Sequence, residues 1–498
     1  MKRTWTIIGL ILALTWGAPA AADYKADIGY TELAAELGAG RPTGAGVKVS
    51  QIEANSGGTG YYSYMPNPSG SEFTGKTITP TYGNPPNPPY TYSGHATSVG
   101  ALFYGNSSSI APGITSITSY LADSWLGSGF LKTTWGLQPG VSPSRIGNHS
   151  WVGAATDSAV NSEILRRLDW LINQDEYLQV VAMNNGSIDK PLLGTSFNSI
   201  AVGLSNGTSA SGSYALDSTY VSGRTRPDIV VPKDATSYAT PVVAAATALL
   251  VQTGHDSGAR LSRDPLINST TNRNGDTIYN SERSEVIKSA LMAGADRSKL
   301  SGYTVNTANG LDYRYGAGQL NIYNSYHIIA AGEQNSKEDY LGHLANIGNY
   351  GFDYDPYFGG LSESNTTGSY YFHTSGAGGL TASLVWNLNV NGGTATSFDG
   401  TATLYHLILS LYDVTNSMDP LLLGFVNSSL DNTENLWTSL TANRDYMLQV
   451  QTASGQDLFL WDYGLAWDIT APVPLPGTAW LLGAGLLALA GWRRQVKR

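Results

Sequence analysis

The stretch from Thr236 to Leu250 constrains the fold most, because it places a reactive residue type at the start of a buried helix. Pro241 suits a first helical turn, where its missing backbone N–H is not needed. The residues that follow are apolar or small on every face, which predicts a helix inside the protein. Ser237 would then lie beside free backbone N–H groups at the positive end of the helix dipole. Those groups can stabilise an oxyanion, although the isolated pattern also fits a serine that only caps the helix.

Composition limits the classes of function. The chain has 498 residues, too many for one compact core, which predicts two or more domains. Its formal net charge is −10, so it has no basic surplus to neutralise phosphates, and we expect no nucleic-acid partner. It contains no cysteine, which excludes disulfides, thiolate catalysis and cysteine-based metal sites.

Both ends have the pattern of targeting segments. Lys2 and Arg3 precede a short apolar run and the small residues 20–22, which predicts a signal peptide over residues 1–22. At the other end, residues 471–498 combine a proline-containing motif, an apolar run and a basic cluster. The run is somewhat short of the ~20 residues that span a bilayer comfortably. The basic cluster would stay cytoplasmic by the positive-inside rule, which predicts a short transmembrane tail that anchors the chain.

This tail closely resembles the PEP-CTERM sorting signal. Pro474-Leu475-Pro476 stands where the family name has Pro-Glu-Pro, so the motif itself departs from the family. The resemblance implies an exported protein of a Gram-negative bacterium, whose tail inserts only transiently in the membrane and is removed by exosortase-type processing machinery. It also implies delivery to the cell surface or extracellular matrix. A plain tail anchor is the alternative.

Residues 23–331 alternate between strand and helix patterns. Residues 47–52 and 178–183 are typical of strands, and Asp157 or Ser158 could cap a helix that runs to Ile172 with one apolar face. Strands that alternate with helices predict an α/β fold, a parallel sheet with helices on both faces. Glu53 follows the first strand, at the sheet edge where ligands and catalysis gather in such folds, although an ordinary loop glutamate is the alternative.

Ordered motifs in this region resemble those of subtilisin-like serine proteases, the subtilases. They are Gly94-His95-x-Thr97, Arg226-Pro227-Asp228-Ile229-Val230-x-Pro232, Thr236-Ser237-x-Ala239-Thr240-Pro241 and Tyr315-Gly316-Ala317-Gly318-Gln319-Leu320-Asn321, together with the strands at 47–53 and 180–186. The acid, histidine and serine also occur in the subtilisin order. The resemblance covers roughly residues 44–331 and implies a subtilisin-like catalytic domain over residues 23–331.

The resemblance implies a serine endopeptidase that hydrolyses protein or peptide substrates through an acyl-enzyme intermediate. Ser237 would attack the peptide carbonyl, and His95 would take its proton and pass it to the leaving amine. Glu53 would orient His95 and stabilise its charged form. Asn185, with the Ser237 backbone N–H, would hold the oxyanion. Asn184 is the fallback for this role, because the register within Asn-Asn is ambiguous.

The motifs depart from the family in several places. Glu53 replaces the family's aspartate, and the added methylene moves the carboxylate about 1.5 Å further out. Ala96 and Ala235 replace glycines, only residues 233–235 separate Pro232 from the serine motif, and we expect no pro-domain before residue 47. These departures leave open an alternative to the active endopeptidase, a catalytically inactive subtilase-like surface protein that binds peptide or matrix polymer. A third hypothesis is an adhesin or structural surface protein whose function lies in its second domain.

The second half has a different pattern. After a predicted linker at residues 332–345, short strands without intervening helices over residues 346–470 predict an antiparallel β-sandwich. The segments 384–386 and 431–435 resemble the jelly-roll domain that follows the catalytic domain in some subtilases.

We expect no required cofactor. Asn272, Asn274 and Asp276 could bind a structural calcium ion, with a solvated loop as the alternative.

Overall fold

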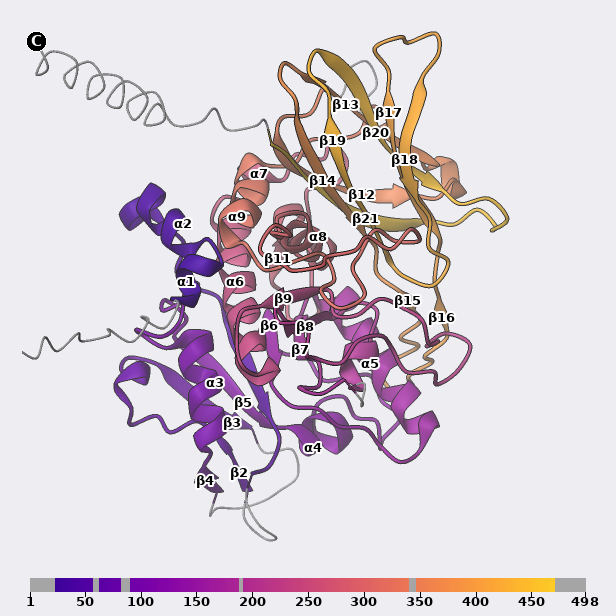
Figure 1. Ribbon diagram of the computed structural model, residues 1–498. Helices are drawn as coiled ribbons and strands as arrows, with labels where there is room; N and C mark the ends of the chain where they lie inside the picture. Colours follow the sequence, from indigo (N-terminus) through magenta and orange to yellow (C-terminus); the bar gives the residue numbers. More distant parts are fainter. Residues whose placement is uncertain (1–22, 57–61, 82–89, 188–190, 340–345, 471–498) are drawn as a thin grey trace, which may run out of the picture.

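The computed structural model describes residues 23–56, 62–81, 90–187, 191–339 and 346–470. The predicted signal peptide, the predicted C-terminal tail and residues 340–345 of the predicted linker lie outside these ranges. Figure 1 shows a lower part built on a central sheet with helices around it, and an upper part built of antiparallel strands. No helix within the described ranges is both long enough and apolar enough to cross a bilayer.

The central sheet has seven strands, and every neighbouring pair is parallel. Its order is β3-β5-β1-β6-β7-β8-β9, with β1 near the middle. The strands are β3 (Thr77–Thr81), β5 (Ser116–Leu121), β1 (Val49–Glu53), β6 (Ile146–His149), β7 (Leu178–Ala182), β8 (Ile200–Leu204) and β9 (Ile229–Val231). This arrangement confirms the predicted parallel sheet.

Helices cover both faces of this sheet. Successive residues of a strand point to opposite faces, so the apolar side chains on each face need helices to pack against. Val180 and Val202 pack in one buried cluster with the apolar residues of α6 (Thr236–Asp256). Val181 lies in a second cluster, with the apolar face of α5 (Ser158–Asp175). Further helices are α3 (Gly94–Tyr104), α8 (Ser284–Ala293) and α9 (Ile322–Ala331). The predicted α/β fold with helices on both faces is thereby confirmed.

Helix α6 is buried along most of its length, as its sequence predicts. Its N-cap residue is Ala235, so Ser237 does not cap the helix but lies within its first turn. The prediction that Pro241 lies in the first helical turn was wrong. Pro241 lies inside the helix, in the second turn. Proline has no N–H to donate to the carbonyl four residues earlier, so the turn that carries Ser237 lacks one intrahelical hydrogen bond.

The upper part is a β-sandwich of two four-stranded antiparallel sheets, as predicted. One sheet has the order β12-β21-β14-β19 and the other β13-β20-β17-β18. The strands are β12 (Tyr350–Phe358), β13 (Thr367–Thr374), β14 (Gly378–Val385), β17 (Leu407–Asp413), β18 (Leu421–Val426), β19 (Thr433–Leu440), β20 (Arg444–Thr452) and β21 (Trp461–Thr470). Trp386 and Trp467 are fully buried in the core between them.

The remaining α-helices and strands within the described ranges are short. They are α1 (Tyr24–Asp27), α2 (Tyr30–Leu37), α4 (Ala122–Ser124), α7 (Gly258–Leu261), β2 (Tyr62–Met65), β4 (Tyr90–Tyr92), β10 (Ser269–Thr271), β11 (Thr277–Tyr279), β15 (Asn389–Val390) and β16 (Ala402–Thr403).

The sandwich and the parallel-sheet part share buried surface. Helix α8 packs against β14 and β21, and a Cβ on Gly464 would lie only 2.7 Å from the backbone carbonyl carbon of Glu285. Leu388 and Val390, from the segment after β14, are buried in the same cluster as the apolar face of α5. Burial of apolar side chains from both parts in common clusters stabilises their contact.

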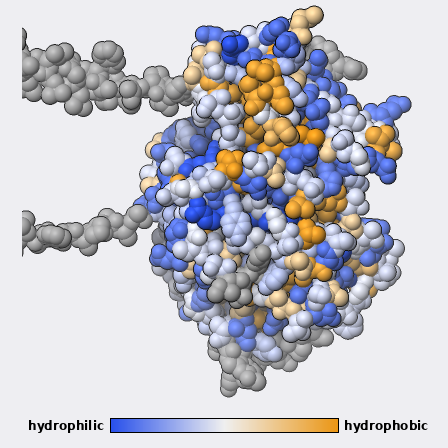
Figure 2. Space-filling model, turned by 45° about the vertical axis from the view of Figure 1, so that its right-hand side comes forward, coloured by the Kyte–Doolittle hydropathy of each residue, from blue (hydrophilic) through white to orange (hydrophobic). Residues whose placement is uncertain are grey.

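Apolar side chains also gather on the surface of the sandwich. On the face drawn in Figure 2 they form a patch in the upper part of the molecule. Strand β18 is an edge strand, and its Leu421, Leu422, Leu423 and Phe425 are exposed.

Candidate active site

The predicted site residues lie on elements that meet at one edge of the parallel sheet. Glu53 is the last residue of β1, and His95 is the second residue of α3. Ser237 is the second residue of α6, which packs against α3. Asn185 follows β7. The carboxyl ends of parallel strands share one sheet edge, which is where open α/β folds bind ligands.

Glu53 and His95 form a direct hydrogen-bonded pair. Nδ1 of His95 lies 3.0 Å from Oε2 of Glu53. Glu53 is only 1% exposed, whereas the His95 side chain is 38% exposed and can be reached from solvent. Burial raises the pKa of Glu53 above its ordinary value, and the hydrogen bond from His95 opposes this rise. The same hydrogen bond raises the pKa of His95.

Ser237 lies close to this pair but is not bonded to it. Its neighbour Tyr238 stacks on the imidazole of His95, with 6.2 Å between the ring centroids. Ser237 is half-buried, and its backbone N–H, in the first turn of α6, has no intrahelical acceptor. No hydrogen bond joins Ser237 to His95 among the residues that the structure describes. Catalytic hydrogen bonds of free enzymes are often long and tighten only when substrate binds.

Asn185, not Asn184, contacts the serine segment through its side chain. Its Oδ1 accepts hydrogen bonds from the backbone N–H of Thr236, at 2.8 Å, and from the Thr236 hydroxyl, at 3.0 Å. These contacts fix the orientation of the amide and leave its Nδ2 donor for another acceptor. The backbone carbonyl of Asn184 instead accepts from the N–H of Ala210. Asn185 therefore presents a donor beside the residue that precedes Ser237.

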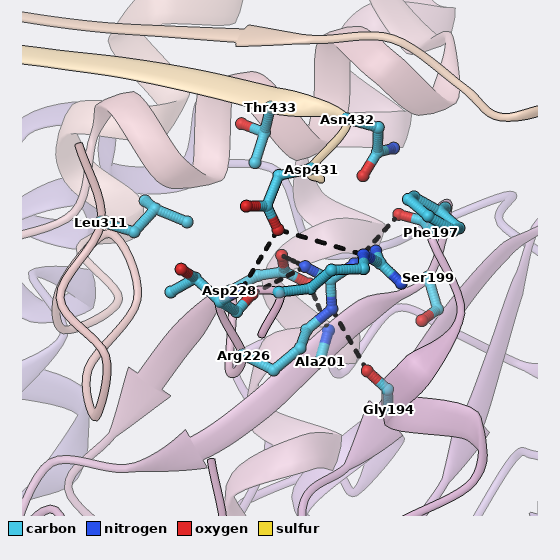
Figure 3. Close-up of polar contacts among 12 residues, drawn as sticks. Gly194, Phe197, Ser199, Ala201, Arg226, Asp228, Leu311, Asp431, Asn432 and Thr433 are labelled. Atoms are coloured by element: carbon cyan, nitrogen blue, oxygen red, sulfur yellow. Dashed lines mark hydrogen bonds and ion pairs between the residues drawn. The ribbon is translucent and has the colours of Figure 1, made fainter. Parts of the chain in front are cut away.

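A buried ionic cluster anchors the segment that leads through β9 to Ser237 (Figure 3). Nη1 of Arg226 lies 3.2 Å from Oδ1 of Asp228, and Nζ of Lys288 lies 3.4 Å from Oδ2 of Asp228. Nε of Arg224 lies 4.0 Å from Oδ1 of Asp431, which belongs to the sandwich. In Figure 3, Asp431 reaches from the segment before β19 toward Arg226 and Asp228. Burial lowers the pKa of Arg224 to about 9 and that of Lys288 to about 8.

The sequence alone did not predict this buried ionic cluster. Arg226 and Asp228 stand in a recognised motif, but Arg224, Lys288 and Asp431 carry no local pattern that indicates a shared site. The distance along the chain between Arg224 and Asp431 explains why periodicity does not reveal the pair.

The residues expected to bind calcium lie in the turn between β10 and β11. Oδ1 of Asn272 accepts from the backbone N–H groups of Asn274 and Asp276, and Nδ2 of Asn274 donates to Asp276. Over the described ranges, no group of three or more His, Cys, Asp or Glu side chains is arranged to hold a metal ion. The calcium site stays a prediction.

Comparison with protein-family models matches residues 472–495 to the PEP-CTERM protein-sorting motif. The tail carries a PEP-CTERM sorting signal. This confirms the interpretation of the C-terminal segment and indicates export. A comparison with curated proteins gives no match.

Comparison with solved structures finds subtilisin-like and sedolisin serine proteases. The Prenylagaramide maturation protease PagA is 16% identical, with 56% of this chain and 92% of that chain covered, at a TM-score of 0.35. A cold-adapted subtilisin-like serine proteinase is 19% identical, with 52% and 86% covered, at a TM-score of 0.33. Pseudomonas sedolisin, a serine-carboxyl proteinase, is 14% identical, with 61% and 97% covered, at a TM-score of 0.39.

Proposed function

We propose that this protein is an exported serine endopeptidase that hydrolyses peptide bonds through Ser237, His95 and Glu53. The observation that carries the proposal is the hydrogen bond from His95 to the buried Glu53 carboxylate, formed beside the helix turn that holds Ser237. A histidine oriented by a carboxylate next to a serine at a helix N-terminus is the arrangement that activates a hydroxyl for acyl transfer.

His95 is the general base of this proposal. Because Nδ1 is bonded to Glu53, the free ring nitrogen is Nε2, which takes the proton from the Ser237 hydroxyl as that oxygen attacks the peptide carbonyl. The imidazolium then donates the proton to the leaving amine, and the acyl-enzyme remains. In the second half of the cycle His95 activates water, which releases the acyl group. The Glu53 carboxylate stabilises the imidazolium in both halves.

Asn185 and the Ser237 backbone N–H form the proposed oxyanion hole. The Asn185 amide is oriented by Thr236, so its Nδ2 donor is positioned before substrate arrives. Preorganised donors of this kind contribute roughly 2.7–4 kcal/mol each to transition-state stabilisation. The Ser237 N–H adds a second donor at the positive end of the α6 dipole.

The sorting signal supports a site of action outside the cytoplasm. We propose that the tail inserts transiently in the membrane, that exosortase-type machinery removes it, and that the protein acts on protein or peptide substrates at the cell surface or in the extracellular matrix of a Gram-negative bacterium. We propose no required cofactor for catalysis.

Labelling with a fluorophosphonate tests the proposal, because the reagent reports an activated serine directly. We expect the exported protein to be labelled and to cleave casein, and both signals to disappear in Ser237→Ala. Ser213→Ala serves as the matched control, since it removes a serine hydroxyl elsewhere in the same domain. Labelling that persists in Ser237→Ala would contradict the assignment.

An inactive surface protein that binds peptide is the second candidate. Two observations favour it: glutamate stands where the subtilases have aspartate, and Ser237 and His95 are not hydrogen-bonded. A folded protein that takes no label and yet retains a peptide substrate in a pull-down would establish this candidate instead.

A further inference from the structure

A buried chain of polar side chains runs from α3 to Glu53. The Tyr104 hydroxyl donates to Oε1 of Gln51 at 2.5 Å. Nε2 of Gln51 donates to Oε1 of Glu53 at 2.9 Å and to the backbone carbonyl of Ala96 at 2.9 Å. Gln51 and Tyr104 are both fully buried. Gln51 and Glu53 point the same way because they lie two residues apart on β1.

The chemistry of the partners fixes the direction of this chain. An ionised carboxylate and a backbone carbonyl can only accept hydrogen bonds, so the NH₂ group of Gln51 must face Glu53 and the Ala96 carbonyl. The Gln51 carbonyl oxygen then faces Tyr104, whose hydroxyl must donate. Each polar group of Gln51 is thereby satisfied, as buried polar groups require. Gln51 joins the acid on β1 to the first turn of the helix that carries His95.

Both oxygens of Glu53 are held by different partners. Oε1 accepts from Gln51, and Oε2 accepts from His95. A glutamate has one more rotatable bond than an aspartate, so a single contact would leave its carboxylate less well fixed. The second contact fixes the carboxylate plane against the imidazole.

A glycine makes room for this chain. A Cβ on Gly100 would lie 2.6 Å from the Tyr104 hydroxyl and 3.1 Å from Oε1 of Gln51. Any side chain at this position would displace the hydroxyl that orients Gln51.

We propose that Gln51, held by Tyr104, is a positioning residue that fixes the Glu53 carboxylate against His95 and ties it to helix α3. The role of Glu53 in catalysis rests on the proposed function, but the positioning of the Glu53–His95 pair does not. The arrangement gives a physical account of how this chain accommodates glutamate at a position where the subtilases have aspartate.

The experiment is an NMR pH titration of His95 in the folded protein, which needs no catalysis. Among the described residues, the titratable side chains that interact with Glu53 are His95 and Tyr104, both from α3. In Gln51→Met the carboxylate loses the second contact that fixes it, so it can turn away from the imidazole and weaken its hydrogen bond to His95. We therefore expect the pKa of His95 to fall by about one pH unit, the equivalent of one hydrogen bond to a charged group. We expect kcat to fall about tenfold or more, with KM nearly unchanged.

Tyr104→Phe is the second variant, in case Gln51→Met does not fold. It removes only the hydroxyl that orients Gln51, and we expect a smaller shift of the His95 pKa in the same direction. Gln449→Met, in β20 of the sandwich, is the matched control and should leave the titration unchanged.

The outcomes separate the two proposals. A lowered His95 pKa in Gln51→Met supports the positioning role even if the protein proves inactive, in which case only the proposed function fails. An unchanged His95 titration in folded Gln51→Met and Tyr104→Phe overturns the inference, whether or not the protein is a protease.

Discussion

Removal of the Asp431 carboxylate tests how strongly the sandwich is held against the parallel-sheet part. Oδ1 of Asp431 accepts from the backbone N–H of Thr225 at 3.1 Å and lies 4.0 Å from Nε of Arg224. Its Oδ2 accepts from Nδ2 of Asn309 at 2.9 Å. The side chains of Arg224 and Asp431 are 0% and 4% exposed. Oδ2 also accepts from the Ser428 hydroxyl at 3.1 Å. Asp431→Ala would therefore leave a cation and three donors without their buried partner.

The expected loss follows from these contacts. Breaking a buried ion pair by removing one partner costs about 3–5 kcal/mol, because the other charge stays buried and uncompensated. Each donor left without an acceptor adds about 1–3 kcal/mol, although the contributions overlap in one network. We expect the free energy of unfolding to fall by about 4–6 kcal/mol in Asp431→Ala. Asp431→Asn should lose less, since it keeps an acceptor for Thr225.

Urea unfolding followed by tryptophan fluorescence and circular dichroism measures this loss. Asp419→Ala, at an exposed position of the sandwich, is the control and should change the free energy of unfolding little. The double variant Arg224→Met/Asp431→Leu should recover part of the loss, because it removes both charges together. A change below about 1 kcal/mol in Asp431→Ala, or one equal to that of the control, would refute the assignment of a buried ion pair.

Further predictions concern the oxyanion donor, the contact between the two parts and the pH dependence of stability. Asn185→Asp keeps an oxygen that accepts from the Thr236 backbone N–H but loses the Nδ2 donor to the oxyanion. The kcat for casein should therefore fall about 100- to 1000-fold with unchanged thermal stability. Near-normal turnover would contradict the role of Asn185 in the oxyanion hole. Gly464→Ala forces a methyl against the backbone of Glu285, which cannot move freely, and urea unfolding should show a loss of about 1–3 kcal/mol. Burial raises the pKa of Glu333 and of Asp468 to about 7. The folded state therefore keeps protons that the unfolded state releases above about pH 4, and the stability from these groups is present at low pH and lost as pH rises toward 7. The melting temperature should be higher near pH 5 than near pH 8, and Asp468→Asn should reduce the difference; an equal difference in that variant would exclude Asp468 as a source.

Much of the fold could be predicted because its signals are local. The apolar run after Ser237 predicted α6, and the helix pattern that ends near Ile172 predicted α5. The end of β1 at Glu53 was also predicted, since strand periodicity and the turn that follows are properties of a few neighbouring residues. The alternation of strands and helices then predicted the parallel sheet.

The contacts that define the candidate site could not be predicted in the same way. The hydrogen bond between Glu53 and His95 joins residues on different elements, and neither residue carries a local sign of the other. Gln51 has the pattern of an ordinary strand residue, and its contact with Tyr104 depends on how α3 lies against β1. The predicted position of Pro241 was also wrong, because α6 begins at Thr236. There the side chain of Asn185 accepts the first free backbone N–H of the helix.

The sequence by itself determined which segments are strands and helices, their order along the chain, and the residue types available for chemistry, because backbone geometry follows from near neighbours. Only the tertiary structure decided that Gln51 holds Glu53 and that Asp431 of the sandwich neutralises a buried cation near β9. Both contacts exist because packing excludes water from these polar side chains, which then have to find partners among the groups that the fold brings beside them.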